Sequence, residues 1–180
     1  MSYLDTLVMS QIARGPFFYM GKKSLERNPI LRIFFKTVDI AFERESKTDS
    51  YRAFKLAGQY LMEGRSLVIF PEGSISSHPP KLRSFKSGAF KLAIEKGIPI
   101  IPVSILNSWD TFYGNGQNGA KPGIIHYFVH NPIYPENFSI GGEEDLKKKV
   151  FSIIQHKLNE YSESLPSHDH WSPEPSGLMN

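Results

Sequence analysis

The sequence contains no cysteine. This absence excludes disulfide bonds, thiolate nucleophiles and cysteine-ligated zinc, and it is compatible with a reducing compartment. The sequence also contains no uninterrupted run of about 18 apolar residues, which is the length that a membrane-spanning helix needs. We therefore expect a protein that is soluble or bound peripherally to a membrane.

The composition is that of an ordinary globular protein. Of the 180 residues, 40% are hydrophobic and 22% are charged, and this length suits one compact domain. Residues 162–180 hold three acidic side chains and no Lys or Arg, so the basic excess lies in residues 1–161. A basic body is compatible with anionic lipid, phosphorylated substrates or nucleic acid. The 162–180 tail is predicted to be disordered.

Helix and strand patterns alternate along the chain. The apolar spacing predicts helices at residues 24–38, 50–64, 85–97 and 143–161, and strands at residues 39–44, 66–71, 98–106 and 124–133. The apolar segment at 16–20 fits either a core strand or a contact with a bilayer. Parallel neighbouring strands need a crossover helix between them. The order therefore predicts an α/β fold, with a central mixed, partly parallel sheet flanked by helices in a single domain, residues 1–161.

A carboxylate follows the predicted 66–71 strand directly, in the sequence "FPEGSIS" (70–76). In open α/β sheets, functional loops gather at the carboxyl ends of the strands. Glu72 could fix a loop or bind a polar group of a substrate, and Gly73 allows the backbone to turn sharply. Pro-Glu-Gly is also common in ordinary turns, so the motif alone leaves both interpretations open.

The functional interpretation of that motif is favoured by three blocks that occur in order: "FPEGS" (70–74), "FKSGAF" (85–90) and "GIPIIPV" (97–103). Together they resemble the glycerolipid acyltransferase family, most closely the bacterial lysophosphatidic acid acyltransferases, over roughly residues 2–160. The resemblance implies transfer of an acyl group from acyl-coenzyme A or acyl carrier protein to the free hydroxyl of 1-acylglycerol-3-phosphate. The product would be phosphatidic acid, and the transfer needs no cofactor and no metal.

The catalytic signature of that family is NHxxxxD, and only its second half is present, with Asp5 as the aspartate. The histidine would stand just before Met1, and it would take the proton of the attacking hydroxyl. Asp5, in the first turn of a helix, would orient it and stabilise the imidazolium. We expect the natural reading frame to continue upstream of Met1, and the 180-residue chain to be inactive. The six histidines present are not placed to replace the missing one: 78, 126, 130, 156, 168 and 170.

The resemblance also implies a site for the acceptor phosphate. The candidate acceptor-binding residues are Arg44, Glu72, Gly73, Ser74 and Lys86. The family usually has arginine after the FPEG[TS] block, where this chain has Ile75. Phosphate binding therefore requires compensation by Lys81, Arg83 or Lys86, of which Lys86 is the preferred candidate.

Two alternative functions remain open at this point. Ile75 favours an acyltransferase for a phosphate-free lysolipid such as a lyso-aminolipid, and the absent histidine favours a catalytically inactive protein that binds lipid or acyl carrier protein. The resemblance implies peripheral binding to the cytoplasmic face of a bacterial membrane, with lysophospholipid, acyl thioester and possible acyl carrier protein as partners. Nucleic acid is not an expected partner, because no recognised motif accompanies the basic charge.

Overall fold

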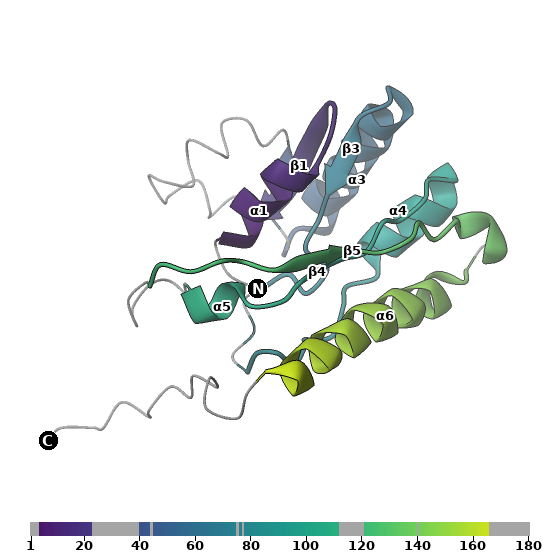
Figure 1. Ribbon diagram of the computed structural model, residues 1–180. Coiled ribbons are helices and arrows are strands. Elements are labelled where there is room, and N and C mark those ends of the chain that lie inside the picture. The colour runs from purple at the N-terminus through teal and green to yellow at the C-terminus, as the bar shows by residue number, and fades with distance from the viewer. Residues whose placement is uncertain are drawn as a thin grey trace, which may run out of the picture.

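The computed structural model describes residues 4–22, 40–43, 45–74, 76, 78–111, 121–139 and 141–165. Arg44 and Ile75 lie outside these residues, as do the helix predicted at 24–38 and residues 166–180 of the predicted tail. The described segments form an α/β structure with helices on both sides of its strands (Figure 1). The predicted fold class is confirmed.

Three strands form a parallel sheet in the order β2-β1-β3. They are β1 (Phe17–Lys22), β2 (Ile40–Phe42) and β3 (Ser66–Val68), paired through Met20 with Ile40 and Phe18 with Leu67. Phe18 is fully buried, so the apolar segment at 16–20 contributes a core strand. The β3 strand is shorter than predicted because residues after Val68 leave the ladder and enter the loop that carries Glu72.

A second, antiparallel sheet contains β4 (Val103–Ile105) and β5 (Tyr127–Val129), with Ser104 opposite Phe128. An isolated bridge between Ile100 and Ile133 extends this pairing beyond β4. The predicted strand 98–106 is therefore interrupted, since Pro99 and Pro102 cannot donate to a ladder. Together, the two sheets account for the mixed, partly parallel arrangement.

The helices are α1 (Leu4–Ile12), α3 (Lys47–Met62), α4 (Gly88–Lys96), the short α5 (Ser108–Thr111) and α6 (Glu143–Ser164), with a 3-10 turn η2 (Pro135–Asn137). Ser46 caps α3 by accepting a hydrogen bond from the Asp49 N–H at 3.2 Å. Gly97 ends α4 with φ 64°, a conformation that favours glycine. Helix α6 runs three residues beyond its predicted end at residue 161.

The core has two main parts that meet at α4. Phe18 and Ile40 pack against Ala53 and Ala57 of α3. Phe90 of α4 packs against α6, whose inward stripe follows the predicted spacing and contains Leu146, Val150, Ile153 and Ile154. In Figure 1, β4 and β5 cross the middle of the molecule between the parallel sheet and α6.

The helix predicted at 85–97 begins three residues later, at Gly88, so Phe85 precedes α4. Gly88 packs closely against α3. A Cβ atom at Gly88 would lie 2.5 Å from Cζ of Phe54 on α3. A larger residue would have to displace that ring, so Gly88 allows α4 to approach α3.

Candidate active site

The loop after β3 is held closed by Glu72. Its Oε2 accepts a hydrogen bond from the Arg83 N–H at 2.8 Å, and the Lys86 N–H donates to the Pro71 carbonyl at 2.8 Å. Gly73 has φ 71°, and its N–H donates to the Phe70 carbonyl at 3.1 Å. The Glu72 carboxylate and the backbone hydrogen bond between Lys86 and Pro71 together close the 71–86 loop.

Ser76 is a second anchor of this loop, and no sequence pattern singles it out. Its buried Oγ donates to the Lys81 carbonyl at 2.9 Å and accepts from the His78 N–H at 3.3 Å. Ser74 and Lys86, in contrast, have exposed side chains. A serine in a polar loop carries no sequence signal for burial, so only the closed loop reveals this role.

Asp5 lies in the first turn of α1 and is only 4% exposed. The following residues fix the helix to β1. The Tyr19 hydroxyl donates to the Thr6 carbonyl at 2.9 Å and lies 2.9 Å from the Ser10 Oγ, which also donates to the Thr6 carbonyl. Burial raises the pKa of Tyr19, and the Ser10 hydrogen bond partly offsets that rise. The phenol therefore stays protonated and tethers the turn that carries Asp5.

A cavity of about 580 Å³ runs between β3, α1, α4, β4 and α6. Met9, Ile12, Val68, Phe90 and Ile154 are among its apolar lining side chains. Among the described residues, its polar and charged lining comes from Arg14, Ser66, Glu72, Ser76, Lys81, Ser108 and Trp109. A mostly apolar cavity with a few polar groups is the usual form of a site for a small molecule.

The cavity brings together part of the predicted site. Glu72 lines it directly. Asp5 lies four residues before Met9 and therefore on the same face of α1, one turn from the lining. Gly73, Ser74 and Lys86 are absent from the described lining, whereas Lys81 belongs to it. Arg44 lies outside the described residues.

On the side of β4 away from the cavity lining, Ser104 and His130 form a hydrogen bond of 2.8 Å between Oγ and Nε2. Burial, and secondarily the charge of Lys157, lowers the pKa of His130 below 6.5. A serine and a neutral histidine at this distance resemble a nucleophile and its base. Ser104 does not line the cavity, and its hydroxyl is already paired with His130, so we interpret the pair as structural.

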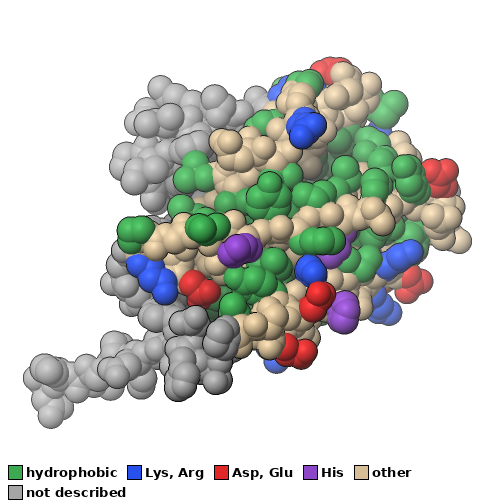
Figure 2. Space-filling model, in the orientation of Figure 1, with side chains coloured by type: hydrophobic (Ala, Val, Ile, Leu, Met, Phe, Trp, Pro, Cys, Tyr) green, Lys and Arg blue, Asp and Glu red, His purple; other side chains and the backbone are tan. Residues whose placement is uncertain are grey.

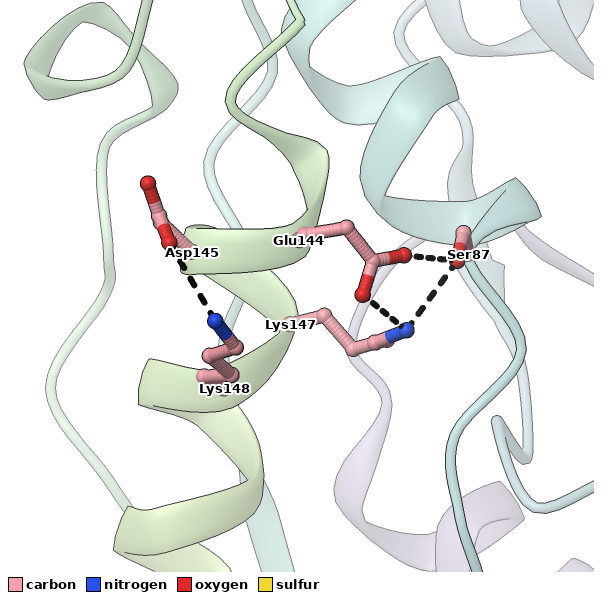
Figure 3. Close-up of polar contacts among 5 residues, drawn as sticks. All are labelled: Ser87, Glu144, Asp145, Lys147 and Lys148. Atoms are coloured by element: carbon pink, nitrogen blue, oxygen red, sulfur yellow. Dashed lines mark hydrogen bonds and ion pairs between the residues drawn. The ribbon is translucent and has the colours of Figure 1, made fainter.

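A third polar cluster links α4 to α6 (Figure 3). The Ser87 Oγ donates to Glu144 Oε1 at 2.6 Å and accepts from Lys147 Nζ at 3.2 Å, and Lys147 also pairs with Glu144. The hydrogen bond from Lys147, followed by that from Ser87, lowers the pKa of Glu144. Because Ser87 directly follows the 71–86 loop, this cluster fixes the start of α4 relative to α6.

Exposed apolar side chains gather along β5 and its flanks, in the band that crosses the middle of Figure 2. They include Ile101, Ile124, Tyr127, Phe128 and Val129. Lys157 Nζ lies 4.6 Å from the centre of the Phe128 ring, which places a cation within this apolar band. Within the described ranges, no helix is both long and apolar enough to cross a bilayer, and no group of three acidic or histidine side chains could hold a metal ion.

These features define an α/β protein with an apolar cavity beside a carboxylate-anchored loop at the carboxyl end of a parallel strand. The chain belongs to the Acyltransferase family, whose model matches residues 1–106.

Relatives and a solved structure agree with this family. The chain is 33% identical over 156 residues to the 1-acyl-sn-glycerol-3-phosphate acyltransferase of Borreliella burgdorferi, covering 86% of this chain and 60% of that protein. It is 27% identical over 158 residues to the enzyme of the same name from Escherichia coli, covering 87% and 63%. Thus it spans less than two thirds of either relative. The crystal structure of the 1-acyl-sn-glycerophosphate acyltransferase of Thermotoga maritima matches 96% of this chain and 65% of that one, with a TM-score of 0.71 at 24% identity.

Proposed function

We propose that the protein transfers a fatty acyl group from acyl-coenzyme A or acyl carrier protein to the free hydroxyl of 1-acylglycerol-3-phosphate, giving phosphatidic acid. Membership of the Acyltransferase family and the activity named for two relatives support the reaction class. The observation that carries the proposal is the cavity of about 580 Å³, whose lining is largely apolar.

The shape of the cavity suits an acyl chain. Its lining follows the backbone continuously from Ser66 to Glu72, a span of roughly 20 Å for an extended segment. Burying methylene groups along this length supplies binding free energy of about 0.8 kcal/mol for each group. The acyl chain of the substrate would thus lie along β3, and its reacting end would lie at the Glu72 loop and the first turn of α1.

The proton transfer is assigned to the histidine that the family resemblance places just before Met1. A neutral imidazole there would remove the proton of the acceptor hydroxyl as its oxygen attacks the thioester carbonyl carbon. Asp5 would hold the other ring nitrogen and stabilise the imidazolium. The burial of Asp5 and the tether of its helix to Tyr19 support this role, because an orienting carboxylate must itself be fixed.

The acceptor would bind at the Glu72 loop. Because Glu72 is already hydrogen-bonded to a backbone N–H, we assign Glu72 and Gly73 the shaping of the pocket, and Ser74 a hydrogen bond to the acceptor. Arg44 and Lys86 are proposed phosphate ligands. Lys81 lines the cavity and carries an exposed ammonium group, so it is the better candidate to compensate for Ile75. The apolar band along β5 and the basic charge support peripheral binding to an anionic membrane.

The test measures thiol release from palmitoyl-coenzyme A with lysophosphatidic acid and, separately, with a phosphate-free lysolipid. Two chains are compared: the protein preceded by Asn-His in frame, and a control preceded by Asn-Ala. With lysophosphatidic acid, the Asn-His chain should be several orders of magnitude more active than the Asn-Ala control, because the control lacks the base.

Activity with the phosphate-free acceptor alone would instead indicate that Ile75 marks an enzyme with a different acceptor substrate. Thioester binding without turnover of either acceptor would support a catalytically inactive lipid-binding or carrier-binding protein. With the phosphate acceptor, Lys81→Met is expected to raise KM more than Lys86→Met does, because only Lys81 lines the cavity.

A further inference from the structure

Ser108 is a buried polar residue with no role in the fold described so far. It is 0% exposed, and among the described residues its Oγ has no hydrogen-bond partner. A buried hydroxyl without a partner is rare, because losing its contact with water costs free energy that a hydrogen bond normally offsets. Ser108 also lines the apolar cavity. An unpaired donor in the wall of a binding cavity indicates that the ligand supplies the missing hydrogen-bond acceptor.

The position of Ser108 in the fold points to the reacting end of that ligand. Ser108 begins α5, three residues after β4 ends at Ile105. In Figure 1, β4 runs toward the end of the molecule at which α1 begins, and the parallel β3 strand leads to Glu72. Carboxyl ends of strands are where α/β proteins place substrates. Residues of α1, the Glu72 loop and α5 all line the same cavity.

We propose that the Ser108 hydroxyl donates a hydrogen bond to the carbonyl oxygen of the bound acyl thioester. This inference rests on the proposed function, since it requires the acyl chain to occupy the cavity. The hydroxyl keeps its proton throughout. When the acceptor oxygen bonds to the carbonyl carbon, negative charge moves to the carbonyl oxygen, and a fixed donor there stabilises it. The carbon–sulfur bond then breaks, and the thiolate leaves with the proton held by the base.

A second serine of the same region provides a matched comparison. Ser104 is also 0% exposed, but its Oγ pairs with His130 and it does not line the cavity. The two serines lie four residues apart and differ in the presence of a protein partner. Removing the Ser104 hydroxyl should therefore affect the fold, whereas removing that of Ser108 should affect a ligand.

The experiment uses the 180-residue chain and two ligands that differ only at the reacting carbon. Palmitoyl-coenzyme A carries the thioester carbonyl, and S-hexadecyl-coenzyme A carries a methylene group in its place. Dissociation constants for both are measured by calorimetry below the micelle concentration, for the unsubstituted chain, Ser108→Ala and Ser104→Ala. Unfolding by urea is measured for the same three proteins.

The unsubstituted chain should bind the thioester roughly two- to tenfold more tightly than the thioether, as one hydrogen bond allows. Ser108→Ala should abolish this preference, leave thioether affinity unchanged and not lower the urea midpoint. Ser104→Ala should keep the preference and lower the midpoint. A preference that survives Ser108→Ala, or equal weakening of both ligands by it, would overturn the proposal.

Two outcomes separate this inference from the proposed function. If the unsubstituted chain binds both ligands equally, the cavity takes the acyl chain and only the role of Ser108 is wrong. If neither ligand binds, the occupancy of the cavity by an acyl chain is wrong, and the assignment of Ser108 is wrong with it.

Discussion

Glu72 illustrates how one side chain can serve both the fold and a site. Glu72 lines the cavity, yet one of its carboxylate oxygens is already engaged by the Arg83 N–H. The acidic residue thus determines where the loop closes, and the loop determines where Lys81 lies. Under the proposed function, the Glu72 side chain would act on the substrate mainly through the backbone that it holds.

Replacing Glu72 with alanine should release the loop. Loss of this hydrogen bond is expected to cost about 1 kcal/mol, and the Arg83 amide should exchange with deuterium several-fold faster. Glu72→Gln keeps an acceptor oxygen and should preserve most of the protection. Unchanged exchange at Arg83 in the alanine variant would show that the loop is held by Ser76 and the Lys86–Pro71 hydrogen bond alone.

His130 makes stability depend on pH. Burial first, and the charge of Lys157 second, lower its pKa below 6.5, so the folded state binds fewer protons than the unfolded state. The contribution of His130 is therefore fully present above about pH 6.5 and is lost as the pH falls through the lowered folded-state pKa. The urea midpoint should fall between about pH 7.5 and 5. Lys157→Met should flatten this dependence, and a midpoint equally steep in that variant would contradict the assignment.

At the scale of secondary-structure elements, the placement of α1 depends on contacts outside the helix. Within the described residues, α1 spans only nine residues, a length at which an isolated helix is marginal in water. The Tyr19 hydroxyl connects β1 to the Thr6 carbonyl, and Met9 and Ala13 pack near Tyr19 and Val68. The sheet therefore fixes the position of the turn that carries Asp5.

Tyr19→Phe should loosen that turn while keeping the ring in the core. The expected loss of stability is about 1 kcal/mol. In the chain preceded by Asn-His, kcat should fall with little change in KM, because the role proposed for Asp5 is to orient the base and not to bind the ground-state substrate. Tyr60→Phe is the control, since it removes a hydroxyl from another tyrosine of the core. A KM effect alone in Tyr19→Phe would argue against a positioning role.

Across the whole molecule, the cavity exists because α6 closes it from the side opposite α1. Leu146 and Val150 fix α6 against Phe90, while Val150, Ile154 and Leu158 contribute to the lining. The polar cluster of Ser87, Glu144 and Lys147 adds a link at the start of α4. Apolar burial, and not this exposed polar cluster, should dominate the attachment of α6.

Leu146→Ala should therefore weaken both the fold and the cavity. The side chain is 0% exposed, so truncation is expected to cost about 2–5 kcal/mol in the free energy of unfolding. Affinity for S-hexadecyl-coenzyme A should fall as well, because α6 forms a wall of the cavity. Ile124→Ala, at a side chain that is 77% exposed, should change stability by less than about 0.5 kcal/mol. Equal effects of the two variants would refute the proposed attachment.

The sequence by itself determined the fold class, the family blocks and most helices. The spacing of Leu146, Val150 and Ile154 predicted α6, because local periodicity depends only on neighbours along the chain. It also predicted that Glu72 follows a core strand, and in the structure Glu72 lies four residues after β3 ends at Val68. These features follow from short local patterns, which can be interpreted without knowing which segments are in contact in the folded protein.

Tertiary structure alone decided which residues share the cavity and what each polar group contacts. Ser76 and Ser108 look like ordinary loop serines in sequence, and no sequence pattern indicates that Lys81 lines the cavity whereas Lys86 is absent from its described lining. Burial and hydrogen-bond partners depend on segments distant in the chain, such as Glu72 with Arg83 or Ser104 with His130. No local sequence pattern encodes such contacts, because they form only when the helices pack against the two sheets.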